Sequence, residues 1–568
     1  MIGADCICAT LADLGVGHVF GLPGSQNTSL YEALRRASLR RIVPSDEGAA
    51  AFMATGYARA TGGVGVLTTI PGPGFLYALP GVAEARDDSA ALLWLTLRQP
   101  DDGQAFPLQK LDQVAIATPL AKHCVQLSRA EELEPGLRAA FDAARSDEPG
   151  PVLVEISAQC LREETAWVGS APVPRVVDTR ELATRLASVL RGSSRPLIYA
   201  GQGAQGAASK VQDLARRLRA PVLFTCSGRG VLPDADELAF VRDFSIGIGA
   251  VVPELVQRAD LIVVLGCKFT HNGSNAGRLD LPAQKLVRVD ASAAVLAANY
   301  PANLALQAPV EDVLDALNAS PAMDDLGPSQ WPREELRLLR ARLDAENSAP
   351  IDHEPVLVDC ARAPVAGFFQ ALSSAMGPNV VYTADAGLHQ VLARRYVNVV
   401  QPRGLLCPSD FQSMGFGLPG AIGAALARPG DRIVACIGDG GLALSVGELL
   451  TAVREKIDLT VVVFNDQAFG LIRRQQLAAY GRTSGVDLHN PDLAALAAAV
   501  GCSYFLIEGD LATAVTAVGR ESGVRLVELR LHDTPSLRVL QAKRVAAESL
   551  RTVTPPGLWR ILKRALRR

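Results

Sequence analysis

Short apolar runs alternate with alanine-rich amphipathic segments along most of the chain. Runs such as 90–97 and 432–437 are almost entirely apolar, as strands buried on both faces of a sheet are, and the segments between them have helical spacing. Strands that alternate with helices form right-handed crossover units in a parallel sheet. The pattern therefore predicts an α/β fold with three doubly wound parallel-sheet domains.

Changes in this pattern divide the chain. A second group of predicted strands, at 196–200, 221–224, 261–265 and 286–289, ends in a polar stretch with several prolines. We expect one charged, solvated helix in that stretch, at 332–346. The predicted boundaries are an N-terminal domain at 1–165, a middle domain at 179–317, a linker at 318–358, a third domain at 359–535 and a C-terminal tail at 536–568.

The first and third domains repeat one another at a constant offset. Gly56 corresponds to Gly423, and Gly74 to Gly441. Both segments contain a helix of small residues, a glycine turn, an apolar strand and a glycine-rich loop. Alanine-rich helices can match by chance, but this match continues through the strand into the next loop, which favours two related sheets.

Composition narrows the class of protein. The 568 residues are 49% hydrophobic and 20% charged, which suits a globular chain with large buried cores. A formal net charge of −3 argues against a nucleic-acid-binding protein. No apolar run reaches the ~18 residues of a membrane span, and no signal peptide is recognisable. The ten cysteines are scattered, so we expect neither a zinc site nor a disulfide framework, and we expect a cytoplasmic protein.

A carboxylate enclosed by glycines follows the predicted strand 432–437, in Gly438-Asp439-Gly440-Gly441. Ligands of an open parallel sheet bind beyond the carboxyl ends of its strands, and glycines let phosphate oxygens reach backbone N–H groups. The helix expected at 445–455 would point its N-terminus at such an anion. A carboxylate beside a phosphate requires a cation between them, which indicates Mg²⁺.

The end of a neighbouring strand is expected to provide a second oxygen ligand. Strand 459–464 is followed by Asn465 and Asp466. If the two strands are adjacent, Asp439 meets either Asp466 or Asn465 at one point. The Gly-x-x-x-x-Gly-Lys-Ser/Thr loop of ordinary triphosphatases is absent.

This pattern resembles the diphosphate signature of thiamine-diphosphate enzymes, in particular the acetolactate synthase, pyruvate oxidase and benzoylformate decarboxylase group. The resemblance extends from about Ala4 to His532. It implies a pyrimidine-binding first domain, a diphosphate-binding third domain, and thiamine diphosphate at the subunit interface of a homodimer or homotetramer. It also implies Mg²⁺ held by Asp439, Asp466 and the backbone oxygen of Ala468, with Asp466 replacing the commoner asparagine. The middle domain is similar to one that binds FAD in some relatives, and the sequence neither establishes nor excludes a flavin.

The same resemblance suggests further roles. Glu47 would activate the cofactor, Met414 would hold it in its bent form, His389 would contact the diphosphate, and Gln109 would face the reacting centre. The alternatives are a helix-dipole acid for Glu47, a core methionine, a structural histidine and a surface glutamine. The full set is Glu47 and Gln109 for catalysis, and Glu47, His389, Met414, Gly438, Asp439, Gly440, Gly441, Asp466, Ala468 and Phe469 for cofactor binding.

Several positions depart from the family pattern. Asp46 replaces a histidine, Gln475 replaces a substrate-gating tryptophan, and Phe75 and Tyr77 are larger than the usual residues, which suggests a reshaped substrate pocket. We expect decarboxylation of a 2-oxo acid and transfer of the acyl carbanion to a carbonyl acceptor. The alternatives are a lyase for 2-hydroxy ketones or 2-hydroxyacyl thioesters, a simple 2-oxo acid decarboxylase, and a catalytically silent paralogue.

The tail 558–568 has five basic residues among eleven, with apolar residues at helical spacing. Such a segment could lie on an anionic membrane or dock on its own subunit. Docking is the commoner outcome, and it is the one expected here.

Overall fold

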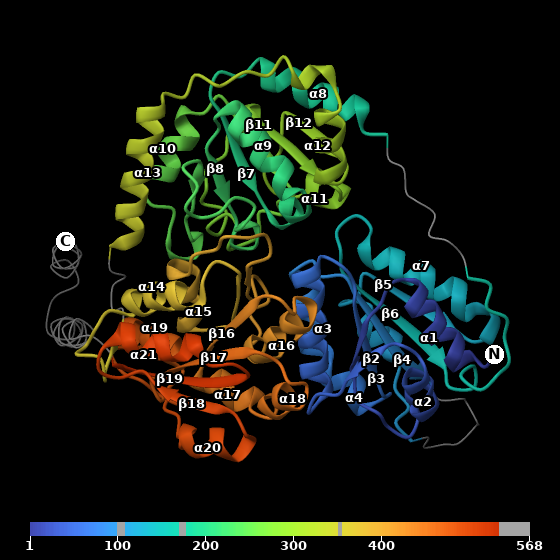
Figure 1. The fold of residues 1–568 in the computed structure, drawn as a ribbon. Coiled ribbons are helices and arrows are strands. Elements are labelled where there is room, and N and C mark those ends of the chain that lie inside the picture. The colour runs from blue at the N-terminus through green and yellow to red at the C-terminus, as the bar shows by residue number, and fades with distance from the viewer. Residues whose placement is uncertain (99–107, 170–177, 350–354, 533–568) are drawn as a thin grey trace, which may run out of the picture.

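The computed structural model describes residues 1–98, 108–169, 178–349 and 355–532 (Figure 1). Three α/β domains are visible: the middle domain lies at the top of the view, and the first and third domains lie side by side beneath it. None of the helices in the described ranges has the length and apolar character needed to cross a lipid bilayer. The basic tail discussed above falls outside these ranges.

The first sheet has the strand order β2-β1-β3-β4-β6-β5, and every pair in it is parallel. Its strands are β1 (His18–Gly21), β2 (Arg40–Ile42), β3 (Gly65–Thr69), β4 (Leu92–Arg98), β5 (His123–Leu127) and β6 (Pro151–Ser157). The accompanying helices are α1 (Gly3–Asp13), α2 (Thr28–Arg36), α3 (Glu47–Thr61), α4 (Pro73–Tyr77), α5 (Leu79–Asp87), α6 (Gln113–Ala117) and α7 (Leu133–Arg145).

The middle sheet is also fully parallel, with the order β12-β11-β10-β7-β8-β9. Its strands are β7 (Pro196–Ala200), β8 (Val222–Phe224), β9 (Ala239–Phe240), β10 (Leu261–Leu265), β11 (Leu286–Asp290) and β12 (Leu304–Gln307). The helices around it are α8 (Arg180–Arg191), α9 (Ala208–Leu218), α10 (Val251–Arg258), α11 (Ala293–Ala297), α12 (Val310–Asn318) and α13 (Arg333–Ser348).

Helix α13 differs from the solvated linker helix that its charged sequence suggested. Leu336, Leu339 and Leu343 are buried in the hydrophobic core of the middle sheet. Their spacing of three and four residues places them on one face of the helix, so α13 is amphipathic and covers that core. The prediction of a solvated helix failed because charged residues outnumber the three leucines of this apolar stripe.

The third sheet has the order β13-β19-β17-β16-β14-β15, with β18 paired to β19. Its strands are β13 (Val356–Leu357), β14 (Val380–Ala384), β15 (Leu405–Leu406), β16 (Arg432–Gly438), β17 (Leu459–Asn465), β18 (Ser503–Leu506) and β19 (Val524–His532). The helices are α14 (Val365–Met376), α15 (Leu388–Tyr396), α16 (Gly417–Ala427), α17 (Asp439–Ser445), α18 (Glu448–Arg454), α19 (Gly470–Tyr480), α20 (Leu493–Val500) and α21 (Leu511–Arg520). Short β13 runs antiparallel to β19, so this sheet is mixed at one end. The predicted α/β class with three doubly wound domains is confirmed.

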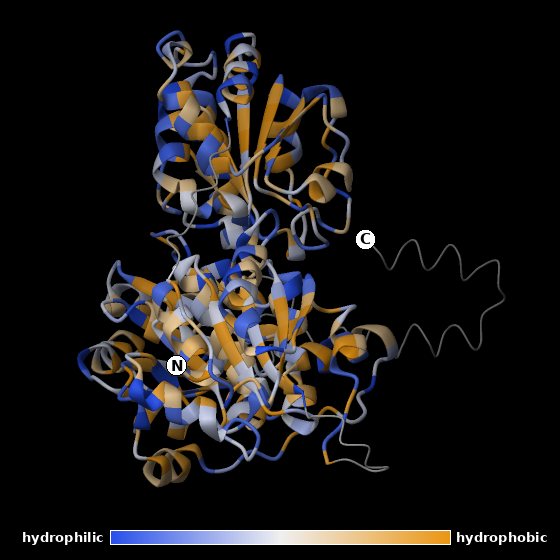
Figure 2. Ribbon diagram, turned by 90° about the vertical axis from the view of Figure 1, so that its right-hand side faces the viewer, coloured by the Kyte–Doolittle hydropathy of each residue, from blue (hydrophilic) through white to orange (hydrophobic). Residues whose placement is uncertain are grey.

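The first and third sheets share a hydrophobic core. In β4, Leu92 and Trp94 point into this shared core, whereas Leu93 and Leu95 point into a separate core on the other face. The residues of β16 alternate in the same way between the shared core and one confined to the third domain. Figure 2 shows the strands as orange bands within more polar helices, as burial on both faces requires.

The two helices related by the internal repeat, α3 and α16, pack against each other (Figure 1). A Cβ atom on Gly56 would lie 2.3 Å from the carbonyl oxygen of Gly420, and one on Gly423 would lie 2.0 Å from that of Met53. Only glycine fits at such distances. The glycines that the repeat analysis aligned are therefore the ones that let the two backbones approach.

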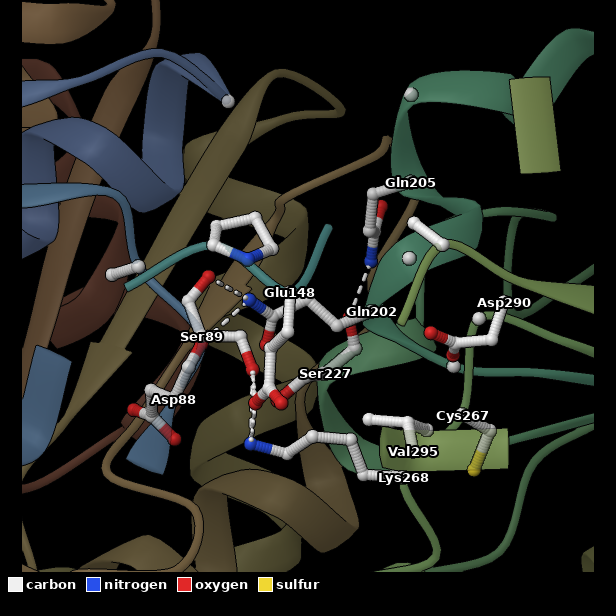
Figure 3. Close-up of a pocket in the computed structure, with 18 of the residues that line it drawn as sticks. Asp88, Ser89, Glu148, Gln202, Gln205, Ser227, Cys267, Lys268, Asp290 and Val295 are labelled. Atoms are coloured by element: carbon white, nitrogen blue, oxygen red, sulfur yellow. Dashed lines mark hydrogen bonds and ion pairs between the residues drawn. The ribbon is translucent and has the colours of Figure 1, made fainter. Parts of the chain in front are cut away.

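Polar contacts attach the middle domain to both others. The Lys268 ammonium lies 2.7 Å from Glu148 of the first domain, and the Gln202 amide donates to the carbonyl oxygen of Asp88 (Figure 3). On the other side, the Arg229 guanidinium donates to the carbonyl oxygens of Arg394 and Val397. A cavity of about 910 Å³ lies where the three domains meet.

Candidate active site

The tips of two neighbouring strands meet at the carboxyl edge of the third sheet. β16 and β17 are parallel partners, with Gly438 opposite Phe464. The Asp439 carboxylate accepts a hydrogen bond of 2.9 Å from the Gly440 backbone. The backbone N–H groups of Gln467 and Ala468, in the loop after β17, lie close enough to lower the pKa of Asp439. The structure therefore brings Asp439 together with the loop that carries Asp466, as the strand pattern predicted.

The local backbone differs from expectation in one respect. Helix α17 begins at Asp439 itself, with Gly438 as its N-cap, and the helix expected at 445–455 is represented by the separate α18. Gly440 and Gly441 thus form the first helical turn and not a loop. Phe469 packs across that turn, since a Cβ atom on Gly440 would lie 2.8 Å from its ring.

Asn490 braces both strand tips, and no motif in the sequence had indicated it. Its side-chain amide donates to Asp439 at 2.7 Å and to the side-chain oxygen of Asn465 at 2.9 Å. The amide of Asn465 in turn donates to Glu528 at 2.8 Å. Both ends of the Asn465 side chain are therefore engaged within the protein.

Burial governs the electrostatics of this edge. It raises the pKa of Asp439, and the hydrogen bonds from Asn490 and the backbone only partly oppose it. Burial also lowers the pKa of His389 to about 3, so its imidazole is neutral near pH 7. The Nε2 atom of His389 is buried without a hydrogen-bond partner, and a Cβ atom on Gly438 would lie 2.9 Å from its Nδ1 atom. A neutral imidazole with an unsatisfied nitrogen thus lies against the glycine-rich turn.

Asp385 positions the segment that carries Met414. Its buried carboxylate accepts backbone hydrogen bonds of 2.9 Å from Ala386 and Gly415, and burial raises its pKa to about 6. A Cβ atom on Gly441 would lie 2.1 Å from the same carboxylate, so this acid ties the 414–417 segment to the glycine-rich turn. Met414 itself is 37% exposed, which excludes a purely core role.

Glu47 lies on the first domain, at the first residue of α3. The preceding Asp46 is the N-cap and accepts a hydrogen bond of 2.9 Å from the Ala49 backbone. Asp46, which stands where the family pattern has histidine, therefore stabilises the start of α3. Glu47 is only 6% exposed, and burial raises its pKa. Its carboxylate lies against Gly74, where a Cβ atom would be 2.2 Å from its Oε1.

Gln109 lies against the same glycine-rich loop. A Cβ atom on Gly72 would be 3.0 Å from the Cβ of Gln109, whose backbone has a φ of 57°. The amide oxygen of Gln109 accepts a hydrogen bond from Gln26, another residue that no motif had indicated. Gln109 is half-buried, so it is not a simple surface glutamine.

Phe75 does not reshape a pocket as its size suggested. It is fully buried and stacks on Trp94, with ring centroids 4.3 Å apart. Tyr77, by contrast, is 62% exposed, and Gln475 is also exposed. The sequence alone does not show whether a phenylalanine in this loop lines a pocket or fills the core. Phe75 is in the core, whereas Tyr77, two residues further along, is exposed.

The candidate residues form two groups within one chain. Glu47, Gln109 and Gln26 belong to the first domain, and His389, Met414, Asp439 and Asp466 belong to the third. Across the described ranges, no hydrogen bond or ion pair joins Glu47 to the third domain; the nearby Ser45 instead donates to Glu448 at 2.9 Å.

Comparisons with known proteins agree with this geometry. Models of the thiamine pyrophosphate enzyme domains match three segments: the N-terminal TPP binding domain at residues 1–116, the central domain at 183–317 and the C-terminal TPP binding domain at 385–529. Both groups of candidate residues thus lie in domains described as binding thiamine pyrophosphate, and the class of protein is an enzyme that depends on this cofactor.

Full-length relatives support the same class. Acetolactate synthase isozyme 1 large subunit of Escherichia coli (strain K12) is 30% identical over 488 residues, covering 84% of each chain. A probable acetolactate synthase large subunit of Methanocaldococcus jannaschii is 29% identical, covering 88% of this chain and 86% of the relative. Probable 2-ketoarginine decarboxylase AruI of Pseudomonas aeruginosa is 30% identical, covering 93% and 94%. The chain belongs to the thiamine pyrophosphate enzyme family, among its carboligases and decarboxylases.

Proposed function

We propose that this protein decarboxylates a 2-oxo acid on thiamine diphosphate and transfers the remaining acyl group to a carbonyl acceptor, in a carboligation like that of acetolactate synthase. The observation that carries the proposal is that the Asn490 side chain joins Asp439 to Asn465, at the tips of two adjacent strands beside the glycine-rich turn. It supports a site for a metal-bound diphosphate in a family whose similar members include acetolactate synthases.

The residues fit a magnesium diphosphate group. The side chains of His389, Phe469 and Asp385 pack directly on the backbone of Gly438, Gly440 and Gly441, which leaves no room for a Cβ atom there. The unpartnered Nε2 of His389 lies beside this turn. Carboxylate oxygens of Asp439 and Asp466 with the carbonyl oxygen of Ala468 form a hard-oxygen set suited to Mg²⁺. Phosphate oxygens of the cofactor would complete the coordination, as is usual for Mg²⁺.

Thiamine diphosphate, when bound, supplies the electron sink for decarboxylation. The chain's own task is to hold the cofactor, move one proton and orient the acceptor. Glu47 is suited to proton exchange with the aminopyrimidine ring because its buried carboxyl group has a raised pKa. Met414 would support the bent cofactor, and Gln109, oriented by Gln26, would face the acceptor.

Because no hydrogen bond or ion pair in the described part of the chain joins Glu47 to Asp439, we propose that a second copy completes each site, in a homodimer or homotetramer. Large apolar side chains are exposed beside both groups of residues: Leu76, Tyr77, Met414, Leu444, Leu450, Phe469, Ile472 and Tyr480. Covering such side chains with another protein surface is favourable in water. A second copy that places its first domain on this face would bury them and join Glu47 to the diphosphate group.

FAD would be accommodated, if used, at the cavity shown in Figure 3. This cavity lies beyond the carboxyl ends of β7, β10 and β11, where Gly201, Gly266 and Asp290 line it. Ligands of parallel sheets bind at such ends. Decarboxylation followed by carboligation is balanced in electrons, so no step of the proposed reaction requires a flavin. The absorbance spectrum of freshly purified protein tests for one.

Product analysis tests the proposed function. Purified protein with thiamine diphosphate and Mg²⁺ is given pyruvate alone, and pyruvate with aldehyde or 2-oxo acid acceptors, and the products are identified by mass spectrometry. A 2-hydroxy ketone or 2-hydroxy-2-acyl acid supports carboligation. Release of free aldehyde alone favours a simple decarboxylase, cleavage of added 2-hydroxy ketones favours a lyase, and no turnover across a broad substrate panel favours a silent paralogue.

A further inference from the structure

Two cysteines from different domains lie in contact where the middle domain meets the third. The sulfur atoms of Cys226 and Cys407 are 3.3 Å apart, although the two residues are 181 positions apart in the sequence. Cys226 begins a short 3₁₀ helix after β8, and Cys407 directly follows β15. Both are free thiols in the structure. The scattered cysteines of the sequence gave no sign of this pair, because only the packing of two domains creates it.

Neighbouring contacts hold the backbone on both sides of the cysteine pair. The hydroxyl groups of Ser227 and Ser409 lie 2.9 Å apart, so a second pair of side chains joins the same two segments. The Gln205 amide donates to the carbonyl oxygen of Ser227 at 2.7 Å. The Arg59 guanidinium donates to the carbonyl oxygen of Cys407 at 2.8 Å. Both segments are therefore fixed, and the two sulfur atoms are held close together.

The two cysteines differ in access. Cys226 is half-buried and lines the cavity where the three domains meet, whereas Cys407 is fully buried. A hydrogen bond from Cys226 lowers the pKa of Cys407, and the positive charges of Arg394 and Arg59 lower it further, against the opposing effect of burial. Ionisable groups in such close contact titrate as a pair. The pair therefore shares one proton and one negative charge beside a cavity that small solutes can enter.

We propose that Cys226 and Cys407 form a reversible disulfide, which joins the middle and third domains covalently when a low-molecular-weight disulfide oxidises them. An S–S bond is about 2.05 Å long, so the two sulfur atoms need to approach by about 1.3 Å in total, shared between two side chains. The proposal is independent of the proposed function, because it concerns the chemistry of the two thiols alone.

The oxidation consists of two thiol–disulfide exchanges. With the shared proton on Cys407, the Cys226 thiolate attacks one sulfur of the small disulfide, whose S–S bond breaks and releases one thiolate. That thiolate takes the proton of Cys407. The Cys407 thiolate then attacks the Cys226 sulfur of the mixed disulfide and expels the second small thiolate. Two electrons pass from the cysteine pair to the oxidant, which becomes two small thiols, and excess small thiol reverses both exchanges.

Oxidised glutathione tests the proposal on the full-length protein. The purified chain is equilibrated in mixtures of reduced and oxidised glutathione, the remaining thiols are blocked by alkylation, and the proteolytic peptides are identified by mass spectrometry. Oxidising mixtures are expected to produce a cross-linked peptide that contains Cys226 and Cys407, with the loss of two of the ten free thiols. Dithiothreitol should remove the cross-link from the folded protein.

Thermal unfolding gives a second measurement. A disulfide that closes a long loop restricts the unfolded chain, so the oxidised protein should unfold at a temperature a few degrees higher than the reduced protein. Dithiothreitol should abolish this difference.

Single substitutions distinguish the two cysteines. In Cys407→Ser, the accessible Cys226 is expected to stop at the mixed disulfide and carry one glutathione. In Cys226→Ser, the buried Cys407 should carry none. Neither variant should show the rise in unfolding temperature on oxidation. Cys502→Ser is the matched control, because it removes another half-buried cysteine and should leave both the cross-link and the rise unchanged.

The proposal fails if oxidised glutathione modifies Cys124 or Cys502, the other half-buried cysteines, without producing the cross-linked peptide. A cross-link that appears only after the chain has been unfolded would overturn it as well, as would one that dithiothreitol leaves in place in the folded protein. The cross-link is measured in the unmodified protein, so a variant that does not fold leaves this test intact.

Discussion

Gly56 on α3 and Gly420 on α16 are in backbone contact, and a Cβ atom on Gly56 would lie 2.3 Å from the Gly420 carbonyl oxygen. This contact joins the domain that carries Glu47 to the domain that carries Asp439. It lies within the hydrophobic core that the first and third sheets share. Together with Gly423, which meets the Met53 backbone at the same crossing, Gly56 therefore fixes the relative position of the two groups of candidate residues within one chain.

Gly56→Ala is expected to destabilise the protein. In an unconstrained helix this change is favourable by ~1 kcal/mol, but here the new Cβ would force the helices apart, at a cost of about 2 kcal/mol or more. Thermal unfolding followed by circular dichroism measures the result. Gly367→Ala in α14 is the matched control, because its Cβ would meet only a Leu511 methyl at 3.5 Å, and it should raise the unfolding temperature slightly. Equal effects of the two variants would contradict this account.

Glu47→Gln is expected to reduce turnover without removing the cofactor. The amide keeps the size of the side chain but cannot exchange a proton, and loss of a positioned acid or base typically costs about 10²- to 10⁴-fold in rate. Steady-state kinetics on the best substrate and calorimetric titration of thiamine diphosphate give the two quantities. Turnover near that of the unmodified enzyme would remove Glu47 from its proposed role.

Asn490→Ala is expected to weaken metal binding. The variant loses the two hydrogen bonds that fix Asp439 and Asn465, and loss of such a supporting residue typically reduces metal affinity about 10- to 100-fold. The dependence of activity on Mg²⁺ concentration measures this change. The thermal unfolding temperature serves as the control for folding. An unchanged Mg²⁺ requirement in a well-folded variant would show that the metal does not bind at Asp439.

Glu84 is expected to make stability depend on pH. It is fully buried with an unpartnered Oε1 atom, and burial, together with the charge of Asp88, raises its pKa to about 8. The folded state therefore binds a proton that the unfolded state, with a pKa of 4.5, releases. This group's contribution is fully present below pH 4.5 and is lost as the pH rises to about 8, at ~1.4 kcal/mol per pH unit.

Glu84→Gln should remove this slope, because the amide stays neutral and its oxygen can still accept the hydrogen bond from the Ser413 backbone. Unfolding curves at several values from pH 5 to pH 9 provide the comparison. The exposed Glu131→Gln is the control and should leave the pH dependence unchanged. A slope that persists in the Glu84 variant would assign it to other groups.

The sequence predicted the three parallel-sheet domains and the meeting of the ends of β16 and β17, because both follow from short-range patterns. Continuous apolar runs identify parallel strands, and polar residues directly after adjacent strands must meet at one edge. Asn490 escaped prediction because its role arises from long-range folding: it lies in a loop after α19 and contacts the tips of two strands far from it in sequence. Phe75 was misjudged because burial depends on Trp94, a residue from another strand.

The assignment of Glu47 and Asp439 to different chains of the proposed dimer has a genetic consequence. Under the proposed dimer, a Glu47→Gln chain still offers a sound diphosphate half, and an Asp439→Asn chain still offers a sound proton-transfer half. If the two inactive variant proteins are mixed and their subunits exchange, half of the dimers are hybrids. Each hybrid has one intact site of two, so the mixture would show about a quarter of normal activity.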